Sequence, residues 1–183
     1  MCSVPALLRD RSGSTTVEFA IVGMLFLTTL LFTMVVAQIL YFNQKLDYAT
    51  GRAARDIVIG NAQSQSPPAS RAAFTQALCG YLPAAMSCGD VIVNLYVVPK
   101  AAQPSGYYTY AKSDMSGLVL PSLTPGSGQF TLGNRGDYQY LQVIYPVTFL
   151  PALLSGWLGA GATYNGKAAY LLMSTAAFRV EQF

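Results

Sequence analysis

The chain has 183 residues and a net charge of +3; 52% of its residues are hydrophobic and only 10% are charged. This composition excludes a disordered or highly charged chain and favours a membrane-tethered protein with one membrane helix and one small domain. Histidine is absent, which removes the commonest general base and the commonest neutral metal ligand.

The lysines and arginines are scattered along the chain, whereas a nucleic-acid binder gathers them in a patch. The sequence also lacks a phosphate-binding glycine loop and a nucleophile elbow. We therefore predict that the protein is not an enzyme. We also predict no cofactor, no metal, no nucleic-acid partner and no small-molecule substrate.

An uncharged stretch runs from Ala20 to Leu40. About twenty helical residues cross a hydrocarbon core of about 30 Å, so we predict a single transmembrane helix over about residues 19–42. Arg9 and Arg11 precede it, which favours a cytoplasmic N-terminus. In a bacterium the following domain would then be periplasmic. A secretory signal peptide cut after Val35-Val36-Ala37 is the alternative, and it predicts an exported soluble binding module that starts at Gln38.

The helical pattern continues past the apolar stretch. Phe42, Leu46, Ala49, Ala53 and Ile57 recur at steps of three and four residues, which predicts one buried face. We expect a long helix over residues 14–60, with Gly60-Asn61 as its C-terminal stop. Residues 1–13 would form a cytoplasmic leader.

One carboxylate, Glu18, stands at the start of the apolar stretch. Thr15 precedes it by three residues, which is the spacing of a capping box. A carboxylate there also meets the positive end of the helix dipole. Helix capping is therefore one complete explanation of Glu18.

The N-terminal residues of the chain also resemble a known signal. A short charged leader, Gly13, and Glu18 five residues later are similar to the class III signal of type IV prepilins. The run Gly-Ser-Thr-Thr-Val-Glu-Phe, the run Gly51-Arg52-Ala53-Ala54-Arg55 and the ending at residues 177–183 resemble the TadE-like pilus assembly proteins, which are pilin-like minor components of the bacterial tight-adherence system. The chain departs from the usual pattern at Phe19, Val180 and Gln182.

The resemblance implies an inner-membrane pseudopilin. A prepilin peptidase would cut after Gly13, and Glu18 of a neighbouring subunit would neutralise the new amino group of Ser14. The implied partners are the lipid bilayer, the peptidase, and another pseudopilin or the pilus assembly platform proteins. The implied function is the assembly or initiation of tight-adherence (type IVc) pili, with entry into the filament left open. The alternative is an uncleaved periplasmic scaffold or regulatory protein of a secretion system.

We predict that the remaining residues, 61–183, form a periplasmic α+β domain with an antiparallel sheet packed on the long helix. Cys79 and Cys88 are close enough to form a disulfide in an oxidising compartment, with two buried free thiols as the alternative. A short helix is expected over residues 70–78. Strands are expected over residues 90–98 and 138–149, and residues 164–180 are expected to contain the last strand, although that segment is also compatible with a helix.

Two segments of this domain have no predicted helix or strand. Residues 101–136 are rich in Gly, Pro, Ser and Tyr and predict a flexible or functional loop. Its tyrosines Tyr107, Tyr108 and Tyr110 are expected to pack in the core, with a contact surface as the alternative. The apolar, glycine-rich residues 151–162 are expected either on the membrane surface or in a subunit interface.

Overall fold

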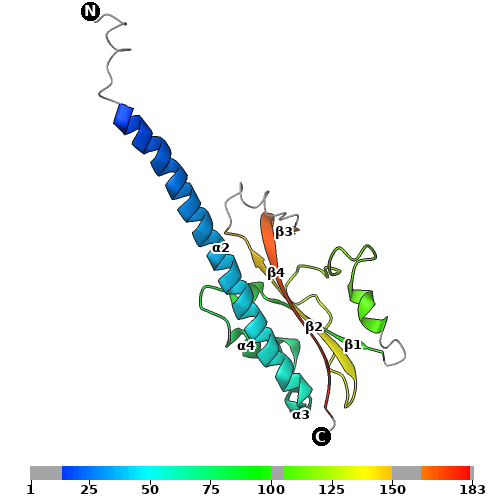
Figure 1. The fold of residues 1–183 in the computed structure, drawn as a ribbon. Helices are drawn as coiled ribbons and strands as arrows, with labels where there is room; N and C mark the ends of the chain where they lie inside the picture. The colour runs from blue at the N-terminus through cyan, green and yellow to red at the C-terminus, as the bar shows by residue number, and fades with distance from the viewer. Residues whose placement is uncertain (1–13, 100–104, 150–161, 182–183) are drawn as a thin grey trace, which may run out of the picture. The chain divides into compact units, whose positions relative to one another are not determined.

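A computed structural model describes residues 14–99, 105–149 and 162–181 of the chain. The chain divides into two compact units, one up to Leu40 and one from Tyr41 onward. We call residues 15–40 the stem and the described residues from Tyr41 the head. The elements in order are α2 (Ser14–Val58), α3 (Asn61–Ser64), α4 (Arg71–Cys79), η1 (Cys88–Asp90), β1 (Ile92–Val98), η3 (Ser105–Tyr110), β2 (Tyr138–Val147), β3 (Ala162–Tyr164) and β4 (Lys167–Arg179) (Figure 1).

Within the head, α2 buries one face. The five residues that the sequence pattern singled out are all buried, and Leu46, Ala49 and Ile57 have no exposed surface. Gly51 is exposed, and a Cβ atom placed on it would meet no atom within 4 Å. Gly60 has a φ of 80°, which glycine adopts without strain. It separates the end of α2 at Val58 from the start of α3.

The sheet has four strands in the order β1-β2-β4-β3, and every neighbouring pair is antiparallel. The predicted α+β class with an antiparallel sheet is confirmed. β1 begins at Ile92 rather than at the predicted Asp90, because residues 88–90 form the η1 turn. β2 ends at Val147, two residues before the predicted end.

Pro146 lies inside β2 without breaking the sheet. The Leu95 N–H donates to the Gln129 carbonyl (2.8 Å), so the backbone groups of Leu95 face the outer edge of β1. Successive residues of a strand turn these groups to opposite sides, and the register then makes the even-numbered residues of β2 face β1. The nitrogen of Pro146 faces the same way, but the pairing with β1 stops at Ile144. The missing N–H therefore removes no hydrogen bond from the ladder.

The last predicted strand is present as β4, and a short strand, β3, precedes it and pairs with it as a hairpin. β3 and β4 are joined by Asn165 and Gly166, which have φ angles of 49° and 75°. Two residues with positive φ are typical of the tight type I′ hairpin turn. β4 contains Leu171, Leu172 and Met173, whose composition is also compatible with a helix.

The two faces of the sheet have different covers. α2 and α4 lie on one side of the sheet (Figure 1), and Phe74 of α4 contacts Phe130 with 5.5 Å between the ring centroids. On the other face, Ile92, Ile144, Tyr164 and Ala169 form a cluster to which Leu123 adds. Leu123, in the segment predicted as a loop, therefore packs against the sheet.

The three loop tyrosines have different environments. The Tyr110 ring stacks on Tyr140 at 4.5 Å and on Tyr96 at 5.0 Å between centroids. Tyr107 is half-buried, whereas Tyr108 is 65% exposed. Core packing thus explains Tyr110, while Tyr108 remains on the surface.

Candidate functional site

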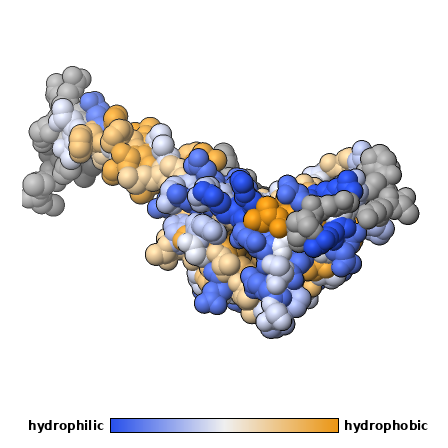
Figure 2. Space-filling model, turned by 90° about the horizontal axis from the view of Figure 1, so that it is seen from below, coloured by the Kyte–Doolittle hydropathy of each residue, from blue (hydrophilic) through white to orange (hydrophobic). Residues whose placement is uncertain are grey.

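Most side chains of the stem are apolar and exposed. Phe19 is 78% exposed and Met24 is 72% exposed, although water favours burial of such side chains by about 1.5–3 kcal/mol each. Among the described residues, α2 is the one helix long and apolar enough to cross a membrane, and none of its most apolar window is buried. Figure 2 shows apolar residues dominating the stem, whereas hydrophilic residues cover most of the visible head. The stem is a candidate single-pass membrane anchor.

Three threonines within the stem make hydrogen bonds inside the helix. The hydroxyls of Thr28, Thr29 and Thr33 each donate to the carbonyl oxygen four residues earlier, at 2.7–2.8 Å. Unsatisfied polar groups in hydrocarbon cost several kcal/mol each, roughly 2–7 on transfer scales. The intrahelical bonds therefore make these threonines compatible with lipid.

Glu18 is the fifth residue of α2 and Thr15 is the second, and both are exposed. Glu18 is the only acidic residue of the stem. The capping box and the pairing with a neighbouring subunit both remain predictions. Gly13, the predicted cleavage residue, lies outside the described residues, as do residues 151–161, for which an interfacial role was predicted.

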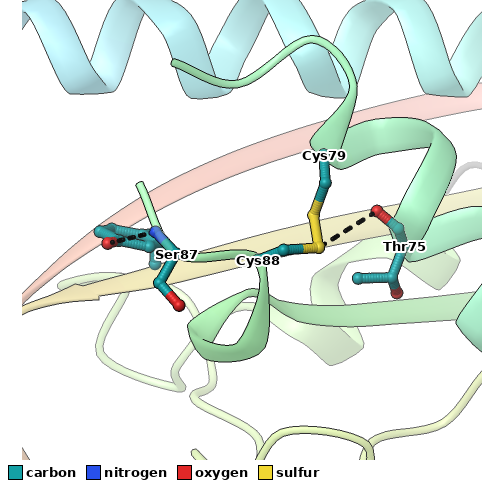
Figure 3. The surroundings of a disulfide bond; sticks show 5 residues. Thr75, Cys79, Ser87 and Cys88 are labelled. Atoms are coloured by element: carbon teal, nitrogen blue, oxygen red, sulfur yellow. Dashed lines mark hydrogen bonds between the residues drawn. A yellow bond between two sulfur atoms is a disulfide. The ribbon is translucent and has the colours of Figure 1, made fainter. Parts of the chain in front are cut away.

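The predicted disulfide is present between Cys79, at the end of α4, and Cys88, at the start of η1 (Figure 3). Its surroundings are polar and partly open: Cys88 is exposed, and the Thr75 carbonyl lies 4.0 Å from the Cys88 Sγ. Next to it, the Ser87 N–H donates to the Tyr145 hydroxyl at 3.2 Å. The bridge therefore ties α4 and η1 together beside the sheet.

A part-buried polar pair joins two segments of the head that are distant in the sequence. The Tyr164 hydroxyl donates to the Asp90 Oδ1 at 2.8 Å. Burial, together with the hydrogen bond and the negative charge of Asp90, raises the pKa of Tyr164 to about 12. Sequence reasoning missed this pair, because 74 residues separate the two side chains and no local pattern links them.

Comparison with known families finds a match for the first part of the chain. Residues 13–55 match a family model described as TadE-like protein. This N-terminal part of the chain is therefore similar to the TadE-like family. The match covers the Glu18 segment, the whole stem and the head part of α2 up to Arg55. No curated protein and no solved structure matches the chain.

The match to the TadE-like family supports an association of the chain with the tight-adherence pilus system. Two of the three predicted points of resemblance lie within the matched residues: the Gly13–Phe19 run and the Gly51–Arg55 run. The third, at residues 177–183, lies outside the match and stays a prediction.

Proposed function

We propose that this protein is a membrane-anchored pseudopilin that takes part in the assembly or initiation of tight-adherence pili. The observation that carries the proposal is the stem: an exposed apolar helix with one carboxylate at its fifth residue, within the segment that matches the family. A charged side chain at the edge of a membrane helix is costly and marks a function or a partner.

In this proposal, residues 1–13 are a cytoplasmic leader that a prepilin peptidase removes after Gly13. The transmembrane part is residues 19–42 of the helix, in the bacterial inner membrane, and the domain of residues 61–183 is periplasmic. The weak excess of positive charge before the stem supports this orientation. The disulfide supports it too, because such bonds persist in oxidising compartments.

The proposed role of Glu18 is to neutralise the α-amino group of Ser14 on a neighbouring subunit. An ion pair in a medium of low dielectric is much stronger than the same pair in water. A carboxylate near the membrane surface could therefore select a cleaved neighbour over an uncleaved one. The neighbour would be another pseudopilin, with the pilus assembly platform as the second partner.

Deletion of the gene in its own bacterium tests the proposal. We expect surface pili of the tight-adherence type to be lost, as counted by electron microscopy, and to return when the intact chain is supplied on a plasmid. Wild-type piliation in the deletion strain would contradict a role in assembly. An uncleaved scaffold that regulates secretion predicts instead that piliation is restored equally by a chain whose leader cannot be cut.

A further inference from the structure

The end of strand β2 lies beside the first head residues of α2. The Phe149 ring, two residues beyond β2, meets the Phe42 ring edge-on with 5.9 Å between the centroids. The Tyr41 ring lies 6.0 Å from that of Phe42. We call Tyr41, Phe42 and Phe149 the junction cluster. All three belong to the head unit, so their arrangement is part of its fold.

The head covers the junction cluster only in part. Phe42 is buried, but Tyr41 is 47% exposed and Phe149 is 51% exposed. Full burial of a large apolar side chain is worth roughly 1.5–3 kcal/mol. Contact of the two exposed rings with lipid or with another protein would therefore be favourable.

The covalent chain fixes the depth of Tyr41 and Phe42 in the bilayer. The proposed transmembrane residues 19–42 are about 36 Å long as a helix, whereas the hydrocarbon core is about 30 Å thick. Tyr41 and Phe42 end this span and directly precede the polar residues Asn43 and Gln44. They therefore lie in the headgroup layer. Their depth rests on the proposed function, in which the stem crosses the membrane.

Phe149 shares that depth whatever the orientation of the head. One headgroup layer is about 5–7 Å thick, and the Phe149 ring is 5.9 Å from that of Phe42. A displacement of this length in any direction keeps the ring within about one headgroup layer of Phe42. Aromatic side chains are enriched at this boundary between hydrocarbon and water.

Lys45 adds a cation beside the junction cluster. Its ammonium lies 5.5 Å from the Tyr41 ring centroid, so the side chain runs back along α2 towards the stem. Tyrosine and lysine together are typical of the ends of membrane helices, where the lysine stem covers apolar surface and the ammonium stays among polar headgroups. This combination favours lipid over another protein as the partner of the exposed rings.

We propose that the head contacts lipid directly through Phe149, whose ring inserts among the headgroups beside Tyr41. The membrane then holds the chain at two places that are far apart in the sequence, the stem and the end of β2. Because β2 is an inner strand of the sheet, this second contact restricts how the whole head can turn about the end of the stem.

Tryptophan fluorescence with brominated lipids tests the proposal. The only tryptophan, Trp157, is replaced by phenylalanine, and one tryptophan is then introduced into the full chain as Phe149→Trp, Phe26→Trp or Tyr108→Trp. Each variant is reconstituted in phosphatidylcholine vesicles whose lipids carry bromine either near the headgroup or near the end of the acyl chain. We expect Phe149→Trp to lose more emission with the shallow bromine than with the deep one.

The other two variants are matched controls. Phe26, in the stem, is 64% exposed, and Phe26→Trp should be quenched most by the deep bromine. Tyr108 is 65% exposed elsewhere on the head. Its neighbour Tyr110 stacks on Tyr140, which is about 24 Å along β2 from the end of the strand. Tyr108→Trp should therefore keep its emission with both lipids.

Each remaining outcome contradicts a different part of the account. Full emission of Phe149→Trp with both lipids, while Phe26→Trp is quenched, would overturn the lipid contact and leave the anchor intact. A blue-shifted Phe149→Trp emission without quenching would overturn it in favour of a protein contact. Equal quenching of Tyr108→Trp would show that the head touches lipid without preference for Phe149. Unquenched Phe26→Trp would contradict the membrane anchor itself.

Discussion

Glu18 is the residue on which the proposed assembly role depends. It is exposed on α2 beside side chains that favour hydrocarbon, such as Val17 and Phe19, which are 59% and 78% exposed. The carboxylate can serve the helix as a cap, a neighbouring subunit as a counter-ion, or both in succession. The two roles predict different effects when glutamine, an uncharged isostere, replaces Glu18.

We expect Glu18→Gln to insert into the membrane at the wild-type level but to reduce piliation strongly. The amide can still accept a hydrogen bond at a helix start, but it cannot neutralise an amino group. Asp47→Asn, which removes an exposed carboxylate from the head part of α2, is the matched control and should leave piliation unchanged. Normal piliation by Glu18→Gln would favour the capping role alone.

Tyr164 makes the head sensitive to high pH. Its pKa is raised from 10 to about 12 in the folded chain. The folded state therefore binds the phenolic proton more tightly than the unfolded state does, so this stabilisation is complete below pH 10 and is lost as the pH rises through about 12.

Tyr164→Phe should lower the free energy of unfolding by about 1–2 kcal/mol at neutral pH, because Asp90 loses a hydrogen bond. The variant should also lose less stability than the wild type between pH 10 and 12. Urea unfolding of the full chain in micelles, followed by far-UV circular dichroism, measures both effects. Parallel pH profiles for the two proteins would show that Tyr164 does not carry the dependence.

At the scale of elements, substitutions at two sites of α2 are expected to change the stability of the head in opposite directions. Gly51 is exposed with free space around its Cα, whereas Ala53 is 2% exposed against the head. Gly51→Ala should stabilise the head by about 0.5–1 kcal/mol, since alanine loses less backbone entropy in a helix. Ala53→Leu should destabilise it by about 1–3 kcal/mol through overpacking. Chemical denaturation that ranks the two variants in the reverse order would contradict the packing described for α2.

The disulfide should contribute measurably to the stability of the head. The bridge closes a segment with a sequence separation of 9 residues, so replacement of both Cys79 and Cys88 by alanine should cost roughly 2–3 kcal/mol. Cys2→Ala is the control and should not change the midpoint of denaturation. Equal midpoints for the double variant and the wild type would show that the bridge does not support the fold.

Much of this architecture could be predicted from the sequence, because its signals are local. The steps of three and four from Phe42 to Ile57 predicted the buried face of α2, and the β-branched run before Pro99 predicted β1. The β3–β4 hairpin was missed although Asn165-Gly166 is a typical turn signal, because β3 has only three residues. The contact between Asp90 and Tyr164 depends on the tertiary fold, which a single sequence does not reveal.

For the whole molecule, the family match and the physical properties of the stem point the same way. The matched residues contain the whole apolar stem and extend into the head as far as Arg55. The remainder of the head, from Asp56 onward, lies outside the match. An anchored pseudopilin is the proposal that accounts for an apolar helix and a folded, disulfide-linked head in one chain.

The mature N-terminus tests this account most directly. The protein is extracted from membranes of its own bacterium, with and without the prepilin peptidase, and its first residues are identified by N-terminal sequencing and mass spectrometry. The account predicts Ser14 as the first residue when the peptidase is present and a longer chain when it is absent. An intact Met1 in cells that contain the peptidase, or a soluble product that starts at Gln38, would contradict it.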